Sequence, residues 1–482
     1  MEPEHYKFGG GSAETLMHPL VLVLMLLVII AVIVMPRRYV LPAFLGGVFL
    51  IPAGQEVLIG ALHVFAYRFI VLAGLLRMVR SRQTPAFAGH WNLTDSIFTL
   101  FVLSHAAAFM ILYPELPAVV NQVGFIWDYL GGYAVLRYAI RDEEDTVRAI
   151  KCFAVLSVVF AASMIREQMT GENIFGTLGG VNLMSEVREG RIRSQSVFQH
   201  SILAGTFGAI MLPLFVLLWK NTRSKFLAGI GGVSVTVMAL TCACSTPLLS
   251  YIAGVTGVCT WPLRRYMRWV RWGLVIGLVS LSLVMNAPVW YVVAHASAVE
   301  GSSGYHRAEL IDTFLRNSGD WWLFGTKSNG AWGNMMFDTS NQYVNFGVTG
   351  GLLCLMSFIG IISSSFAGLG RTRRLVDGND RWWERFLWFL GAALFVNVVA
   401  FFGISYFDQT RVAWFALLAM ISAGTAKALT DTRKPARNDE IVPPVSEPEM
   451  GGVLSGWNAS SETADRDLSG IWSQGPSSGR HS

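Results

Sequence analysis

The sequence predicts an all-α membrane protein, a bundle of about 12–13 spanning helices with two long loops on its outer face. Hydrophobic residues make up 53% of the 482 positions and charged residues only 14%, whereas a soluble globular chain carries about 25% charged residues. The mean hydropathy is +0.46. Apolar blocks of about 17 residues or more recur, long enough for a helix to cross the bilayer core. This composition excludes an ordinary soluble enzyme, a nucleic-acid-binding module and a disordered scaffold.

Each apolar block gives one expected helix, and the first block is interpreted as a retained span rather than a cleaved signal. It follows an acidic leader that contains Glu2, Glu4 and Glu14, and no small-residue cleavage site comes after it. The expected helices, in chain order, cover residues 17–35, 40–55, 57–77, 93–113, 119–137, 150–166, 198–219, 226–244, 246–261, 272–293, 341–366, 385–407 and 410–427.

The orientation follows from Lys and Arg, which concentrate in alternate short loops and mark the cytoplasmic side of a membrane protein. The loops assigned to that side are 36–39, 77–90, 137–151, 220–225, 262–271 and 367–385. Strict alternation with the amino terminus outside agrees with every one of them. The long segments 167–197 and 294–340 then lie outside, and the carboxyl terminus lies in the cytoplasm.

Two domains are expected. Residues 1–430 form the membrane domain, and residues 431–482 form a disordered cytoplasmic tail, because the tail is rich in Pro, Gly, Ser and charge and lacks apolar periodicity. The five cysteines fall in or beside apolar blocks, which is typical of small buried hydrophobic residues. Cys242 and Cys244 lack metal-site spacing, so we expect no metal and no cofactor.

The two outer segments carry cations on the face where such residues are usually scarce. The first contains Arg188, Arg191 and Arg193, followed by His200, and the second contains Arg307 within a dense group of aromatic residues. Arginine suits bidentate contacts with phosphate oxygens, so a phosphorylated lipid-linked substrate fits this pattern. Headgroup contacts, or ion pairs with the acidic residues of the same loops, explain the cations equally well at this stage.

Three segments of the chain, in order, resemble motifs of the O-antigen ligase and O-antigen polymerase (Wzy-type) superfamily. Residues 193–202, RSQSVFQHSI, are similar to R-x-x-G-x-F-x-H-P-N. Arg307, followed by DWWLFG at 320–325, is similar to R…D-x-P-L-x-G. Residues 340–350, SNQYVNFGVTG, are similar to H-N-x-Y-L…G-x-x-G. The resemblance covers residues from about 190 to 360.

The resemblance implies a metal-independent glycosyltransferase of the bacterial inner membrane. Its substrate would be an oligosaccharide on undecaprenyl pyrophosphate, transferred to a sugar hydroxyl at the periplasmic face during exopolysaccharide, capsule or O-antigen synthesis. Membrane lipid and a chain-length-regulating co-polymerase are further expected partners. The chain departs from the pattern at Ser196, at Ser201 and Ile202, at Trp322, and at Ser340, which replaces a histidine of the ligases. The last change favours a polymerase over a ligase.

Residue roles follow from the matched positions. Arg193 and Arg307 are expected to hold the pyrophosphate, with Arg191 as a weaker contact. A general base close to the acceptor is sought in Asp338 or His306.

His200 and Asn341 are further substrate-binding candidates, although either side chain could instead order its own loop. Asp338 could instead cap the helix that begins near Asn341. Arg68 is the one cation expected near the middle of a span, where it would reach a lipid phosphate or pair with Glu56 or Asp128.

An alternative from another class is a lipid-linked oligosaccharide flippase or polysaccharide exporter. Such a transporter should line a cavity with charge across the membrane depth and break helices at the midplane. The charges of this chain concentrate in the outer loops instead, which favours chemistry at one face.

Overall fold

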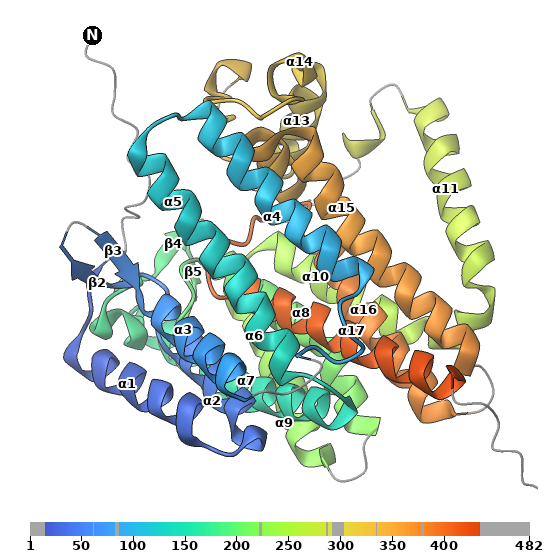
Figure 1. The fold of residues 1–482 in the computed structure, drawn as a ribbon. Helices are drawn as coiled ribbons and strands as arrows, with labels where there is room; N and C mark the ends of the chain where they lie inside the picture. Colours follow the sequence, from blue (N-terminus) through green and yellow to red (C-terminus); the bar gives the residue numbers. More distant parts are fainter. Residues whose placement is uncertain are drawn as a thin grey trace, which may run out of the picture. The chain divides into compact units, whose positions relative to one another are not determined.

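The structure is a computed structural model that describes residues 15–60, 62–81, 86–220, 224–285, 288–291, 303–333, 335–376 and 380–433. These residues form a helical bundle with two small sheets at one edge (Figure 1). The expectation of an all-α membrane fold agrees with this architecture. Among the described residues, six helices are long and apolar enough to cross a bilayer, and four shorter apolar helices accompany them.

The amino-terminal region differs most from the prediction. Helices α1 (Pro19–Val34) and α2 (Arg37–Leu50) are followed by strands β2 (Gln55–Ile59) and β3 (Leu62–Phe65), and only then by α3 (Ala66–Arg80). Strand β1 (Thr15–Leu16) pairs in parallel with β2. The helices predicted at 40–55 and 57–77 are therefore wrong where they adjoin, because Gln55–Ile59 and Leu62–Phe65 pair as an antiparallel hairpin there. Arg68 consequently lies in the first turn of α3 and not in the middle of a span.

The central helices overlap the predicted spans, with ends displaced by up to seven residues. Helix α4 (Leu93–Leu112) is followed by α5 (Leu116–Ile126), a π-helical turn η1 (Trp127–Gly131) and α6 (Gly132–Ala139), which run on as one kinked rod. The next helices, in order, are α7 (Glu143–Thr170), α8 (Ser201–Lys220), α9 (Lys225–Thr241) and α10 (Ser245–Cys259).

The core gathers around α8, which is buried along most of its length. Helix α8 packs against α7, α9, α10 and α16 (Arg381–Ala400). Phenylalanines fill the space between them, and the Phe207 ring lies within 5.9 Å of the rings of Phe49, Phe153, Phe160 and Phe198. Such aromatic packing fixes the orientation of α8, whose first turn carries the candidate site.

The second outer segment is folded against helix α15 (Gln342–Val376). It contains α13 (Ser303–Arg316), α14 (Ser318–Trp321) and η6 (Gly330–Trp332). Helix α15 breaks at Gly351, where φ is +73°, and α17 (Thr410–Arg433) closes the described chain. The tail expected from residue 431 begins within the end of α17, and residues 434–482 lie outside the described part.

Helix α11 (Met267–Val284) stands apart from the bundle at its edge (Figure 1). It is preceded by η4 (Trp261–Tyr266) and followed by η5 (Val289–Tyr291), and its close neighbours are these two turns. No residue of α11 is buried, although the helix is predominantly apolar beyond Arg268 and Arg271 in its first turns. A lipid environment accounts for such a surface, since it would be unstable in water.

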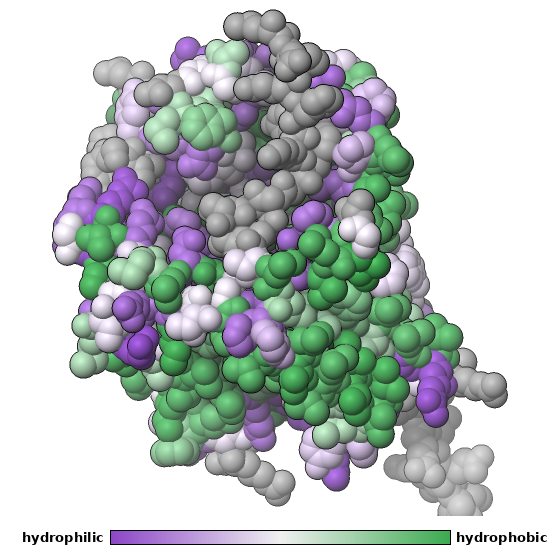
Figure 2. Space-filling model, turned by 90° about the vertical axis from the view of Figure 1, so that its left-hand side faces the viewer, coloured by the Kyte–Doolittle hydropathy of each residue, from purple (hydrophilic) through white to green (hydrophobic). Residues whose placement is uncertain are grey.

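The outer surface of the bundle also suits a bilayer. Figure 2 shows hydrophobic side chains gathered over the lower half of one face and hydrophilic ones over its upper part. Exposed leucines and isoleucines on α1, such as Leu20, Leu26 and Ile30, are 66%, 48% and 57% exposed. A soluble monomer rarely exposes a continuous apolar surface of this kind, so we treat the chain as a membrane protein.

Candidate functional site

The first outer segment forms a short hairpin that sets the position of Arg193. Strands β4 (Glu186–Arg188) and β5 (Arg191–Arg193) pair with Glu186 opposite Arg193. The connecting residues Glu189 and Gly190 both have positive φ, at 53° and 75°, which is the geometry of a two-residue type I′ turn. That turn fixes the register, and Arg193 Nη1 donates to both carboxylate oxygens of Glu186 at 3.0 Å.

Glu167, at the end of α7, holds the chain that follows the hairpin. Its fully buried carboxylate accepts hydrogen bonds from the backbone N–H groups of Gln195 and Ser196 and from the hydroxyl of Ser185, at 2.8 to 3.1 Å. Ser196 has φ of +54°, a left-handed conformation that favours glycine. Ser196 stands where the motif that this segment resembles has glycine.

Arg193 and Arg307 meet at the turn between α9 and α10. Arg193 Nη2 and Nε lie 2.6 and 3.2 Å from Cys244 Sγ, and Arg307 Nη1 donates to the hydroxyl of Ser245 at 3.3 Å. The two arginines are only 5% and 7% exposed. Residues 114 positions apart in the sequence thus contact adjacent residues of one turn.

The charged groups of this cluster shift one another's pKa values. A hydrogen bond with Cys242 lowers the pKa of Cys244 to about 6, against the effect of burial, and Arg193 lowers it further. Burial lowers the pKa of Arg307, whereas Cys244 and Asp338 raise it. The Cys244 sulfur and two buried guanidinium groups therefore lie together at this turn.

His200 and Asp338 border the same cluster. His200 Nδ1 accepts the N–H of Ile202 at 3.1 Å, so the imidazole caps the first turn of α8. Burial lowers the pKa of His200, Arg193 lowers it further, and Glu186 and Asp338 oppose this. A neutral ring whose Nδ1 is engaged by the backbone is poorly placed to accept a proton from a substrate.

The two candidates for a general base differ in access. Asp338 is exposed, just before α15, and close enough to Arg307 and His200 to influence the pKa of both. His306 is half-buried on α13, and its Nε2 is enclosed without a hydrogen-bond partner. Asp338 is thus the more accessible of the two.

Asn341 and Arg191 occupy less direct positions. Asn341, not Asp338, caps α15, because its Oδ1 accepts the N–H groups of Tyr343 and Val344 at 3.0 and 3.2 Å. Its side chain is enclosed, and the residue is only 1% exposed. Arg191 lies on β5 and is exposed. It shares a face of the strand with Arg193 by the two-residue period, but its side chain lies outside the buried cluster.

Two glycines hold the second outer segment against α15. Gly325 has φ of +90°, and a Cβ there would lie 2.3 Å from the carbonyl oxygen of Val348. Gly351 similarly approaches the carbonyl oxygen of Leu323. Backbone hydrogen bonds from Thr326 to Val348 and from Leu352 to Trp322, both 2.8 Å, complete the contact. The segment that follows Arg307 is therefore fixed to the same helix that Asn341 caps.

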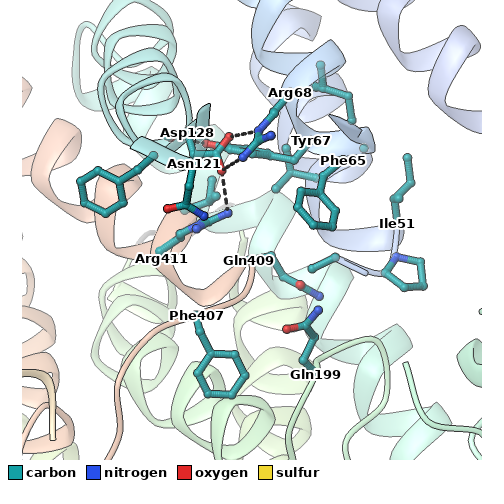
Figure 3. A pocket seen from close by; sticks show the side chains of 17 residues that line it. Ile51, Phe65, Tyr67, Arg68, Asn121, Asp128, Gln199, Phe407, Gln409 and Arg411 are labelled. Carbon is teal, nitrogen blue, oxygen red and sulfur yellow. Dashed lines mark hydrogen bonds and ion pairs between the residues drawn. The ribbon is translucent and has the colours of Figure 1, made fainter. Parts of the chain in front are cut away.

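A second cationic site surrounds Arg68 in a cavity of about 260 Å³. Arg68 Nε donates to Asp128 Oδ1 at 3.0 Å, and Arg411 Nη2 donates to Asp128 Oδ2 at 3.4 Å (Figure 3). Asp128 is therefore the partner of Arg68, whereas Glu56 pairs with His63 at 2.9 Å. Arg411 Nε is buried without a hydrogen-bond partner. Two arginines thus share the one carboxylate that lines the cavity.

The backbone geometry around Asp128 supports this arrangement. Asp128 lies in the π-helical turn η1, where an extra residue redirects the side chain. Gly124, one turn earlier, leaves room for Arg68, because a Cβ there would lie 2.3 Å from Arg68 Nη2. Gln199 and Gln409 point into the same cavity from other elements (Figure 3).

The two cationic sites lie on either side of one segment. Gln199 lines the cavity around Arg68, and the next residue, His200, borders the cluster around Arg193. The loop between α16 and α17 holds this segment, because Asp408 accepts the N–H of Gln199 at 3.2 Å and Gln409 donates to the carbonyl of Val197 at 3.0 Å. Both sites therefore belong to one end of the bundle.

Sequence reasoning missed four residues of these sites, namely Glu167, Cys244, Ser245 and Arg411. Glu167 and Arg411 are charged residues at predicted helix ends, so their position was the available signal. Cys244 and Ser245 fall where two predicted spans meet, and no local pattern marks them. Among the described residues, no group of three or more His, Cys, Asp or Glu is arranged to hold a metal ion.

Comparison with models of known protein families finds no match, and no characterised protein is significantly similar to the chain.

Proposed function

We propose that the protein is a membrane glycosyltransferase, a polysaccharide polymerase that uses a glycan carried on undecaprenyl pyrophosphate. In this proposal, a sugar hydroxyl of the acceptor attacks the anomeric carbon of the donor glycan at the periplasmic face. The bond from that carbon to the pyrophosphate oxygen breaks, and undecaprenyl pyrophosphate leaves. No metal is required, because cationic side chains neutralise the leaving group.

The observation that carries the proposal is the meeting of Arg193 and Arg307 at one turn. The two residues come from separate outer segments and were identified individually from motifs, yet both contact the adjacent residues Cys244 and Ser245. Both are nearly buried, so their charges act in a medium of low dielectric constant. Such preorganised cations stabilise charge that develops on a leaving pyrophosphate.

Asp338 is the proposed general base for the acceptor hydroxyl. Its exposed carboxylate lies beside Arg307, on the open side of the cluster. His306 is the alternative, and its enclosed Nε2 would have to become accessible first. Asp338→Asn should lower the rate with little effect on donor binding, while His306→Gln should leave the rate within a few-fold.

The cavity around Arg68 and Arg411 is proposed to hold a second phosphate group of a lipid-linked substrate at the same end of the bundle. Its two arginines exceed its single carboxylate, and Arg411 keeps an unused donor. A polymerase needs two lipid-linked substrates, donor and acceptor, whereas a ligase of the resembled superfamily transfers to another acceptor. The second cationic site, together with Ser340, favours the polymerase.

Polymer length in the native host tests the proposal. Arg193→Ala and Arg307→Ala should each abolish long polymer at normal protein level. Arg316→Ala is the matched control, because Arg316 lies on the same helix as Arg307 but is 75% exposed and pairs with Asp312 at 2.8 Å. Lysine at 193 or 307 should restore activity only in part, since it keeps the charge but loses the bidentate geometry.

Normal polymer in both alanine variants would refute the assignment of the site. Loss of activity in Arg316→Ala to the same degree would indicate a diffuse basic surface. If the protein were a flippase, the same variants would prevent single repeat units from crossing the membrane. The units that still cross would be polymerised to the normal chain length.

A further inference from the structure

Helix α11 and the end of α15 form a second, separate basic site. Arg268, Arg271, Trp272 and Val275 of α11 line a pocket of about 360 Å³ together with Arg374 of α15. The four α11 residues recur at helical spacing, so they lie on one face of the helix. The pocket is thus built between the first turns of α11 and the last turn of α15.

The three arginines of this pocket are not neutralised by the described residues. No acidic residue lines the pocket, and no ion pair joins any of the three to a described carboxylate. Arg271 Nε donates only to the carbonyl of Met267 in its own helix, at 3.2 Å. Arg264, at the neighbouring turn, differs because it pairs with Glu384 at 3.3 Å. Within the described part of the chain, the pocket therefore concentrates three positive charges without a counter-ion.

The surroundings of the pocket are those of a lipid-facing surface. Beyond the arginines, α11 is exposed and apolar along its whole length, with Leu274 and Ile276 64% and 60% exposed. Trp272 lies between the basic turn and this apolar stretch, where tryptophan is typical of the boundary between headgroups and acyl chains. A ligand that fits both parts has an anionic head and hydrocarbon tails.

We propose that this pocket binds an anionic phospholipid of the surrounding bilayer. The phosphate accepts hydrogen bonds from Arg268, Arg271 and Arg374, and the acyl chains lie along the apolar surface of α11. Guanidinium groups suit phosphate oxygens, and basic pockets between helices are typical sites for anionic headgroups such as that of cardiolipin. The lipid would bridge α11 to α15, two helices that have little direct contact.

This site is distinct from the one around Arg193 and Arg307. Asn341 caps the first turn of α15, and Arg374 lies in its last turn. They lie at opposite ends of α15, whose unbroken part at residues 352–376 alone spans roughly 37 Å at 1.5 Å per residue. The charge pattern of the loops assigns the basic pocket to the cytoplasmic face. Its occupancy does not depend on the proposed transferase activity.

Native mass spectrometry of the full-length protein tests the proposal, with cardiolipin as probe and phosphatidylethanolamine as the zwitterionic comparison. The variant is Arg268→Ala with Arg271→Ala and Arg374→Ala. The control removes three exposed cations from other loops assigned to the same face, with Arg38→Ala, Arg80→Ala and Lys225→Ala. The control keeps the net charge equal to that of the variant.

Wild-type protein and the control should retain cardiolipin over phosphatidylethanolamine. The pocket variant should bind cardiolipin on the order of 100-fold more weakly, at about 5-fold for each arginine. Lysine at all three positions should keep most of the affinity. An equal loss in the control would overturn the proposal in favour of a diffuse basic surface. Equal binding of both lipids by wild type would also overturn it.

Discussion

Removal of the Glu167 carboxylate should release the segment that carries Arg193. The carboxylate accepts the N–H groups of Gln195 and Ser196 and the hydroxyl of Ser185. In Glu167→Ala, two buried backbone N–H groups lose their partner, at about 1–3 kcal/mol each. The expected loss in the free energy of unfolding is therefore about 2–6 kcal/mol. Glu167→Gln keeps one acceptor oxygen and should lose about half as much.

Hydrogen exchange measures this effect at the residues concerned. The amides of Gln195 and Ser196 should be protected in wild type and should exchange faster in Glu167→Ala, before the rest of α7 and α8. Glu172→Ala is the matched control, since Glu172 lies five residues later and is exposed. Unchanged protection at residues 195 and 196, with an unchanged unfolding transition, would refute the anchoring role of Glu167.

Three further variants test other contacts. Gly325 has a positive φ, and Gly325→Ala places a Cβ 2.3 Å from a carbonyl oxygen of α15, so this variant should lose more than about 2 kcal/mol in the free energy of thermal unfolding. Gly330→Ala, whose Cβ would meet only the Ser328 hydroxyl at 3.5 Å, should lose much less. Asp128→Ala leaves two arginines without their carboxylate and should cost about 3–5 kcal/mol. Glu144→Ala breaks the pair with Arg148, in which the Glu144 side chain is 84% exposed, and should cost less than about 1 kcal/mol. Burial lowers the pKa of His200 below its ordinary value of 6.5, so protonation of the ring favours the unfolded state. The contribution of His200 to the free energy of unfolding is therefore complete above pH 6.5 and is lost as the pH falls below that value. His200→Asn keeps a capping acceptor and should flatten this acid limb of an unfolding-versus-pH curve.

Much of the bundle could be predicted because long apolar blocks define helices directly. The exception is the hairpin of β2 and β3, where the apolar run QEVLIGALHVF was assigned to helix. A short apolar run is compatible with strand or helix, and periodicity alone does not separate them. Gly60, with φ of +63°, marks the turn that divides the run.

The candidate site was predictable only in part. Arg193 and Arg307 could be singled out because each lies in a segment that resembles a motif, and the structure places both at the turn between α9 and α10. Their contacts with Cys244 and Ser245 could not, since these depend on how α9 and α10 pack against α8. Arg68 was recognised as unusual, but its place within the helix was misjudged together with the hairpin. Arg411 was missed because its position at a predicted helix end is equally typical of an interfacial cation.

The central claim, transfer from a lipid pyrophosphate at the Arg193 and Arg307 cluster, is tested most directly by single-turnover transfer. The full-length protein in nanodiscs is supplied with the lipid-linked repeat unit of its host, and chain length and released undecaprenyl pyrophosphate are followed together. Wild type should produce both at equal rates, and Arg193→Ala and Arg307→Ala should slow both by about 10²–10³-fold, by analogy with a lost oxyanion donor. Elongation at wild-type rate in both variants, or repeat units that change sides of the membrane without elongation in wild type, would contradict the account.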